Sequence, residues 1–180
     1  MSPTAHAAAA AELARREPVR CAVLTISDTR TIENDDSGAT IVQLLEQGHH
    51  RVVDRGLVRD DPPTIRATLE EWIDDPRVQA ILTTGGTGIA RRDGTVDVVR
   101  ALLTAELEGF GELFRVLSYE RVGAAAMLSR AVGGIVVRGA GTDDATFVFA
   151  MPGSVDAVTT AMERLIVPEL AHLVWERRRG

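Results

Sequence analysis

A segment rich in glycine and charge follows one of the apolar runs of this chain and offers the clearest chemistry. Its sequence is TTGGTGIARRDG, over residues 83–94, and the residues of interest are Gly85, Gly86, Thr87, Gly88, Arg91, Arg92 and Asp93. Glycine lets the backbone approach a ligand closely, and successive N–H groups can then form an anion-binding nest. The arginines and the start of the following helix add positive charge for phosphate. The segment is therefore a candidate phosphate-binding loop, although it has neither P-loop nor GxGxxG spacing.

The aspartate of this segment needs its own explanation, because a carboxylate repels phosphate. Asp93 would serve a phosphate site if a divalent cation lay between the two groups. It would be structural if it capped the next helix. The residues alone leave two interpretations open: the floor of a phosphate site, or a glycine turn that ends in an aspartate cap.

Two adjacent carboxylates, Asp60 and Asp61, follow another apolar run and precede Pro62-Pro63. Asp61 suits the N-cap of a helix, and Pro62 suits its first position. Asp60 has no such structural task and is the stronger candidate for chemistry. Together with Asp93 it would supply two carboxylates to a magnesium–nucleotide site, in which the metal bridges protein and phosphates.

The remaining candidates lie in two other loops that lead into helices. They are Ser27, Asp28, Ser37, Gly38, Pro152, Gly153 and Ser154. We expect Asp36 or Ser37 to cap the first of these helices and Ser154 to cap the last. Contact between an anion and the free amides at these helix starts is the second interpretation.

Alternating strands and helices must position these loops. Apolar, β-branched runs predict strands at residues 19–27, 51–58 and 78–84, and a final pair at 133–140 and 146–152 joined by a turn at 141–144. Apolar spacing predicts helices at about 38–47, after 62, after 95, around 110–117, at 127–128, and from 155 onward with a bend near Pro168. This order indicates an α/β domain with a mainly parallel sheet and an antiparallel edge. Ligands bind beyond the carboxyl ends of such strands, so the loops should open at one edge.

The bulk properties narrow the function classes. The chain has 180 residues, 45% hydrophobic and 26% charged, with a net charge of −6. We expect an alanine-rich, partly helical tail at 1–17, one domain at 18–176 and a basic end at 177–180. The negative charge does not favour nucleic-acid binding, and the absence of long apolar runs does not favour a membrane span. The N-terminus lacks a signal-peptide pattern, so we expect a cytoplasmic protein.

Three other features have structural interpretations. The single cysteine, Cys21, lies in an apolar strand and is expected to be a core residue. His49-His50 has no further ligand at metal-binding spacing, so a metal site is not expected there. The phenylalanines of the run GFGELFRVLSYE recur at helical spacing and are expected to be core residues.

Six segments resemble the molybdopterin adenylyltransferases of molybdenum-cofactor biosynthesis, of the MogA/MoaB type. They are TISDTR, DDSG, TTGGTGIARRD, ELEGFGELFRVLSYE, AAMLSRAVGGI and FAMPGSVDAV, and they span about residues 20 to 170. The resemblance implies a three-layer α/β/α domain. It also implies that the terminal phosphate of molybdopterin attacks ATP in the presence of Mg²⁺, giving adenylyl-molybdopterin and pyrophosphate. The product would pass to a partner that inserts molybdenum.

The same resemblance assigns residues and assembly. It makes Asp60 and Asp93 the catalytic, metal-binding aspartates and residues 85–88 the nucleotide loop, with residues 152–154 in the pocket. It implies a homotrimer or a hexamer. One position departs from the family pattern: Gly94 stands where a β-branched residue is common. Two other functions remain open, namely a related enzyme that cleaves nucleotide pyrophosphate bonds, and a pterin- or nucleotide-binding scaffold without turnover.

Overall fold

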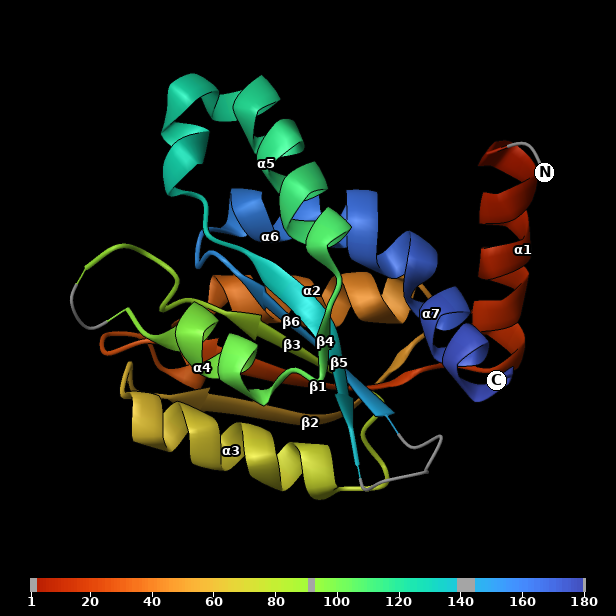
Figure 1. The fold of residues 1–180 in the computed structure, drawn as a ribbon, viewed down its shortest axis with the longest axis horizontal. Helices are drawn as coiled ribbons and strands as arrows, with labels where there is room; N and C mark the ends of the chain where they lie inside the picture. The colour runs from red at the N-terminus through yellow and green to blue at the C-terminus, as the bar shows by residue number, and fades with distance from the viewer. Residues whose placement is uncertain (1–2, 91–92, 139–144, 180) are drawn as a thin grey trace.

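A single six-stranded sheet organises the chain in the computed structural model, which describes residues 3–90, 93–138 and 145–179 (Figure 1). The strand order is β2-β1-β3-β6-β5-β4. The strands are β1 (Arg20–Ile26), β2 (Arg51–Val58), β3 (Ala80–Thr84), β4 (Ala105–Glu106), β5 (Val132–Val137) and β6 (Ala145–Met151). β2, β1, β3 and β6 are mutually parallel, whereas β5 and β4 pair antiparallel. The mainly parallel sheet with an antiparallel edge is thus confirmed.

Helices cover both faces of the sheet and complete a three-layer α/β/α domain (Figure 1). One face carries α3 (Pro62–Asp74) and α4 (Thr95–Leu102). The other carries α2 (Asp36–Gln47), α5 (Glu108–Val122), α6 (Val155–Ala161), the π-helical turn η3 (Met162–Ile166) and α7 (Val167–Arg179). Two short 3₁₀ segments, η1 (Ile32–Asn34) and η2 (Gly123–Leu128), lie in the connections. The predicted three-layer architecture is confirmed.

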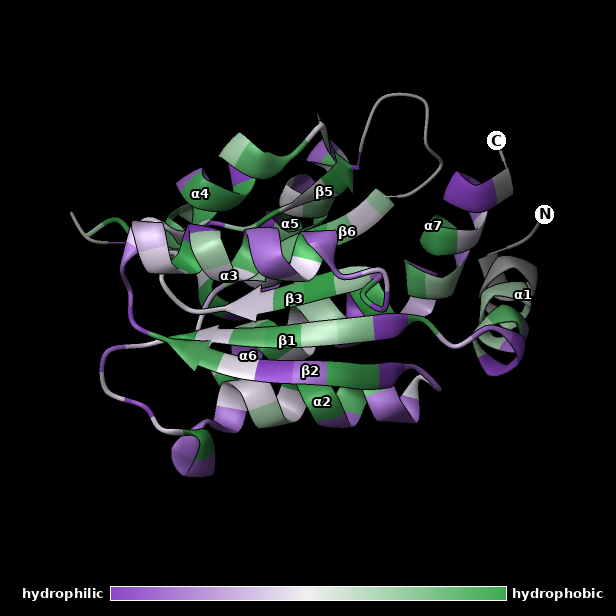
Figure 2. Cartoon of the chain, turned by 90° about the horizontal axis from the view of Figure 1, so that it is seen from below, coloured by the Kyte–Doolittle hydropathy of each residue, from purple (hydrophilic) through white to green (hydrophobic). Residues whose placement is uncertain are grey.

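Alternation along the central strand explains the two layers. In β1, Cys21 and Val23 pack into the layer of α2 and α7, whereas Ala22 and Leu24 pack into the layer of α3 and α4. A strand buried on both faces reads as a continuous apolar run, and Figure 2 shows β1 hydrophobic over most of its length. Cys21 is the core residue that the sequence predicts, and burial raises the pKa of its thiol.

The two ends of the chain pack together. Residues 3–16 form α1 (Pro3–Arg16), which lies beside α7 (Figure 1). Ala14 is buried and joins the core cluster that contains Leu170 and Ala171. The segment expected as a partly helical tail is therefore a docked helix. None of the described helices is long and apolar enough to cross a bilayer.

The last helical region is interrupted where a bend was expected near Pro168. The π-helical turn η3 separates α6 from α7, and Pro168 is the second residue of α7. Proline has no N–H to donate to the carbonyl four residues before it, so a regular α-helix cannot run through this point unbroken.

The cap of α2 differs from the prediction. Asp36 or Ser37 was expected to cap this helix, but Asp35 is the N-cap: its Oδ1 accepts from the Gly38 N–H at 2.9 Å. Its Oδ2 accepts from Thr25 Oγ1 at 2.7 Å and from Arg55 Nη2 at 3.0 Å. The prediction was wrong because three consecutive residues have capping side chains, and only the buried Asp35 also meets partners on β1 and β2.

This network gives a stability prediction for Asp35→Asn. Burial raises the pKa of Asp35, but hydrogen bonds from Thr25, the Gly38 N–H, Arg55 and Ser37 outweigh it, so the net pKa is lowered. The substitution leaves Arg55 without its charged partner, and we expect it to cost about 2 kcal/mol of unfolding free energy at pH 7. A lowered folded-state pKa stabilises above the unfolded value, so the loss should shrink as the pH falls below about 4.

Urea unfolding of wild type and variant at several pH values measures this effect. The matched control is Asp36→Asn, because the Asp36 side chain is 74% exposed and forms a surface ion pair with Arg30 at 3.6 Å. The control should lose less than about 0.5 kcal/mol. Equal losses in both variants would contradict a special role of Asp35.

Candidate functional site

Four strand ends meet at one edge of the sheet and define the candidate site. Figure 2 shows β1, β2 and β3 pointing the same way toward this edge. Beyond it, the Ser27 N–H donates to Val58 O at 2.9 Å, and the Asp60 N–H donates to Asp28 Oδ1 at 3.2 Å. The Gly85 N–H donates to Met151 O at 3.1 Å. The loops after β1, β2, β3 and β6 therefore converge as the sequence predicts.

The glycine loop touches its surroundings so closely that two positions exclude a side chain. Gly85 and Gly86 have φ of +98° and +61°. A Cβ on Gly85 would collide with the carbonyl of Ile26, and one on Gly86 would collide with Thr95 Oγ1. Gly153 completes the contact, because a Cβ there would lie 3.2 Å from Gly85 Cα. The backbone after β3 can make these contacts only because these residues are glycines.

Asp60 approaches the loop from the segment after β2, on the far side of β1 from β3. Its Oδ1 lies 2.9 Å from the position that a Cβ on Gly86 would take. Asp61, one residue later, caps α3 by accepting from the Thr64 N–H at 3.1 Å, and Pro62 is the first residue of that helix. The prediction that Asp61 is the helix cap is confirmed. Asp60 faces the glycine loop.

Asp93 approaches the same loop from its other end. Its Oδ2 accepts from the Ala90 N–H at 2.8 Å and lies 2.5 Å from a Cβ position on Gly88. The N-cap of α4 is Gly94, with no side-chain cap bond. The interpretation of Asp93 as a helix cap is therefore wrong, because its carboxylate turns back to close the loop. Arg91 and Arg92 lie outside the described residues.

The loop leaves backbone donors open between the two carboxylates. Among the described residues, the N–H groups of Gly86, Thr87 and Gly88 have no hydrogen-bond acceptor. The loop is tied to α4 by the Thr95 N–H, which donates to Gly86 O at 3.1 Å. Consecutive unpaired amides next to a helix start favour an anion such as phosphate.

The two carboxylates, Asp60 and Asp93, are also candidate ligands for a metal ion. No group of three or more His, Cys, Asp or Glu side chains is placed for metal binding in the part of the chain that the structure describes. Mg²⁺ commonly takes one or two carboxylates and completes its shell with substrate phosphates and water. Asp60 and Asp93, on either side of the glycine loop, fit that pattern.

The other predicted site residues are partly occupied by local structure. Ser154 caps α6 by accepting from the Ala157 N–H at 3.2 Å, as predicted. Ser37 Oγ and the Gly38 N–H both donate to Asp35, so these groups are engaged within the cap. Pro152 O accepts from Thr84 Oγ1 at 3.1 Å, which holds residues 152–154 next to the glycine loop.

Arg130 is a site residue that the sequence did not single out. Its Nη1 donates to Gly88 O at 3.3 Å, and its Nη2 donates to Asp97 Oδ2 at 3.0 Å. It lies 42 residues beyond Gly88, between η2 and β5. The sequence offered no signal beyond a charged residue in a small-residue segment, because only the fold brings that segment to the loop.

The fold and the site together define an α/β protein with a candidate phosphate-binding edge, and comparison with known proteins identifies its family. Residues 22–172 match the family model described as "Probable molybdopterin binding domain". Molybdenum cofactor biosynthesis protein B of Bacillus cereus is 47% identical over 162 residues, covering 89% of this chain and 92% of that protein. The chain therefore belongs to the molybdopterin-binding domain family of molybdenum cofactor biosynthesis, and the resemblance inferred from the sequence motifs is confirmed.

Solved structures agree. A crystal structure of molybdenum cofactor biosynthesis protein B has a TM-score of 0.85 at 45% identity, covering 91% of this chain and 98% of that chain. The tungsten cofactor synthesizing protein MoaB from Pyrococcus furiosus has a TM-score of 0.80 at 37% identity, covering 90% and 98%. The fold of this chain is that of the MoaB and MogA proteins.

The contacts of Arg130 give a prediction for the glycine loop. Arg130→Gln removes a charged donor from Gly88 O, and a hydrogen bond to a charged group contributes about 1.5 kcal/mol. We expect the two hydrogen-bonded amides of the loop, those of Ala90 and Thr95, to exchange with solvent about tenfold faster. Hydrogen exchange read by mass spectrometry measures this.

Arg121→Gln is the matched control. It removes the same charge from a surface arginine that pairs with Asp156, away from the loop. Its loop exchange should equal wild type. Equal acceleration in both variants would show that Arg130 does not hold the loop.

Proposed function

We propose that this protein adenylylates molybdopterin with MgATP. The terminal phosphate of the pterin attacks the α-phosphorus of ATP, an oxygen–phosphorus bond forms, and the bond to the β-phosphate breaks. The products are adenylyl-molybdopterin, available to a molybdenum-inserting partner, and pyrophosphate. The proposal combines membership of the family with the geometry of the edge.

One observation carries the proposal: two carboxylates border the same open glycine loop. Asp60 meets it at Gly86 and Asp93 meets it at Gly88. A neutral-ligand site would gain nothing from two carboxylates beside unpaired amides. A polyphosphate with a divalent cation satisfies both kinds of group at once.

The residues have distinct roles in this mechanism. The N–H groups of residues 86–88 would bind phosphate oxygens, and Asp60 and Asp93 would hold Mg²⁺. When bound, Mg²⁺ neutralises charge on the phosphates. Ser27, Asp28 and residues 152–154 would line the pocket for the nucleotide or the pterin. Arg130 positions the loop through Gly88 O.

No general base is required. The attacking phosphate is already an anion near neutral pH, so the protein need not remove a proton from it. Phosphoryl-type transfer depends mainly on positioning and on stabilising charge in the transition state. The loop would position the phosphates, and the two carboxylates would hold the Mg²⁺ that neutralises their charge.

A turnover assay tests the proposal. Product should form only when molybdopterin, ATP and a divalent cation are all present, and EDTA should abolish it. Asp60→Asn and Asp93→Asn should each lower turnover roughly a hundredfold, because each removes a charge that positions the reacting phosphates.

Asp61→Asn is the matched control for Asp60→Asn. It removes the same charge one residue away, and asparagine caps a helix as well as aspartate does. Its turnover should stay near wild type. Pyrophosphate release without pterin would identify a pyrophosphate-cleaving enzyme, and ligand binding without turnover would identify a scaffold.

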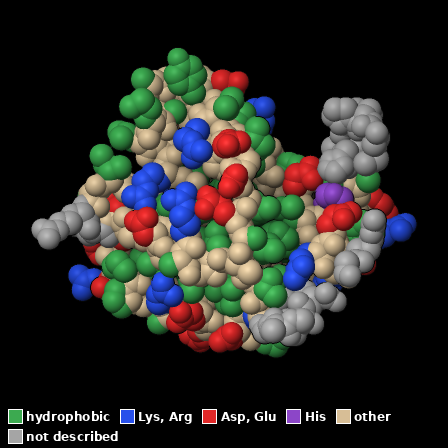
Figure 3. Space-filling view, in the orientation of Figure 1, with side chains coloured by type: hydrophobic (Ala, Val, Ile, Leu, Met, Phe, Trp, Pro, Cys, Tyr) green, Lys and Arg blue, Asp and Glu red, His purple; other side chains and the backbone are tan. Residues whose placement is uncertain are grey.

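We also propose that the chain assembles as a trimer or hexamer. An apolar surface is exposed on α5 and η2, and Figure 3 shows hydrophobic side chains gathered there at the top of the molecule. Its members are Leu113, Val116, Tyr119, Val122, Met127 and Leu128, each between 52% and 81% exposed. A contiguous patch of this kind is typical of an interface.

A ring needs two different surfaces that fit each other. The second is an apolar hollow of about 670 Å³ between the start of α5 and the helices η3 and α7. Its walls include Phe110, Leu165 and Leu173. One copy would place its α5–η2 surface against the hollow of the next.

Light scattering tests the assembly. Wild type should have about three or six times the 19.4 kDa chain mass. Val116→Glu should dissociate it, because a charge would be buried in the interface. Ile32→Glu is the control, since Ile32 is an exposed apolar residue outside the patch. A monomeric wild type would contradict the proposal.

A further inference from the structure

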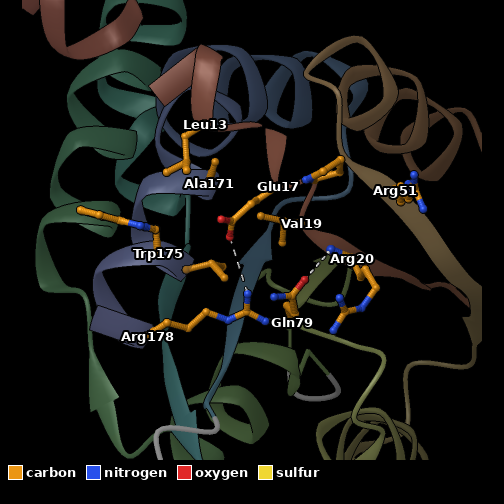
Figure 4. Close-up of a pocket in the computed structure, with 11 residues that line it drawn as sticks. Leu13, Glu17, Val19, Arg20, Arg51, Gln79, Ala171, Trp175 and Arg178 are labelled. Atoms are coloured by element: carbon orange, nitrogen blue, oxygen red, sulfur yellow. Dashed lines mark hydrogen bonds and ion pairs between the residues drawn. The ribbon is translucent and has the colours of Figure 1, made fainter. Parts of the chain in front are cut away.

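A second cavity lies at the opposite end of the sheet from the candidate site. It has a volume of about 290 Å³ and opens where β1 and β2 begin, beside Gln79 just before β3. Helices α1 and α7 complete its walls (Figure 4). Because β1 is seven residues long, this cavity lies roughly 20 Å from the glycine loop.

The walls of this cavity differ in character. Leu13, Val19, Ala171 and Val174 give it an apolar side from α1, the start of β1, and α7. The polar lining residues include three arginines, Arg20, Arg51 and Arg178, together with Gln79. Figure 4 shows Arg178 reaching from α7 toward Gln79 and Glu17.

The basic side is held in place by the fold. Arg20 Nε donates to Arg77 O at 2.7 Å, and Arg20 Nη2 donates to Pro76 O at 3.3 Å. Gln79 Oε1 accepts from the Arg20 N–H at 3.0 Å, and Gln79 is 8% exposed. These bonds fix one arginine and the glutamine without using a carboxylate.

Positive charge in the cavity is not balanced. Glu17 is the one carboxylate among the described lining residues, which include three arginines. It pairs with Arg178 at 3.9 Å, and both side chains are more than half exposed. Such an ion pair is weak, so an incoming anion can displace Glu17. The excess is notable in a chain of net charge −6.

From these features we infer that the cavity binds a small organic anion, a phosphate monoester or a carboxylate with a compact apolar body. Arginine forks match the oxygens of both groups. The volume lies at the lower end of the range for ligand sites, which excludes a dinucleotide. The apolar wall takes the body of the ligand while Arg178 and Arg20 take its charge.

The inference is independent of the proposed adenylylation. Most of the lining residues lie outside residues 22–172, the segment that matches the family model. They come from both chain ends, so a bound anion would clamp α1 and α7 onto the sheet. The site is thus a property of this chain's termini.

Two probes that share an apolar body test it, phenyl phosphate and benzoate, each titrated at about 0.15 M salt to screen non-specific attraction. The readout is the indole N–H signal of Trp175 in ¹H–¹⁵N NMR spectra, since Trp175 lines the cavity. Trp72, buried in the layer of α3 and α4, is an internal reference that should not move. Saturation by one probe identifies its chemical class.

Variants that remove single charges test whether the anion binds in this cavity. Arg178→Gln should weaken binding at least tenfold, about the contribution of one charge-assisted pair. Glu17→Gln should strengthen it, because the competing carboxylate is gone. Arg16→Gln is the control, since Arg16 lies on α1 with its side chain 76% exposed and does not line the cavity. Melting temperatures establish that each variant is folded.

The inference is overturned if neither probe saturates the Trp175 signal, or if Arg16→Gln weakens binding as much as Arg178→Gln. Weaker binding by Glu17→Gln would also overturn it. Gly86→Val, which should block nucleotide binding at the glycine loop, should leave this titration unchanged. Failure of the adenylylation proposal is therefore distinguishable from failure of this one.

Discussion

The close approach of four backbones at Gly85 and Gly86 is the constraint on which the site depends. A Cβ at these two positions would collide with the carbonyl of Ile26 and with Thr95 Oγ1, and a Cβ on Gly153 would lie 3.2 Å from Gly85 Cα. The loop therefore lies directly on the ends of β1 and β6 and on the first turn of α4. Asp60 and Asp93 can border one short loop because glycines at residues 86 and 88 leave room for their carboxylates.

Much of this arrangement was predictable from the sequence. The apolar runs set the strands, and parallel strands bring successive loops to one edge. Asp61 and Ser154 were predictable as caps because each precedes a helix start with the right side chain. The glycines were predictable as a close approach because no other residue tolerates it.

Other features depend on tertiary contacts that local patterns do not encode. Asp35, and neither Asp36 nor Ser37, is the N-cap of α2, because it also contacts Thr25 and Arg55. Arg130 reaches Gly88 only because η2 ends beside the loop. The docking of α1 on α7 joins the two ends of the chain, so the cavity between them has no motif to reveal it.

Gly94, the position at which the sequence resemblance indicates a departure from the family pattern, affects stability without changing the backbone conformation. Its φ of −107° and ψ of −4° are accessible to any residue, so glycine is not required by the backbone as it is at Gly85 and Gly86. Its effect is entropic: glycine at such a position costs about 0.4–1 kcal/mol relative to a residue with a side chain, because the unfolded chain has more freedom to lose. This cost destabilises the connection between Asp93 and α4. Two hydrogen bonds offset this entropic cost. The Ala90 N–H donates to Asp93 Oδ2, and the Thr95 N–H donates to Gly86 O. The closure of the loop on Asp93 therefore depends on these two hydrogen bonds, and not on stiffness of the residue between them.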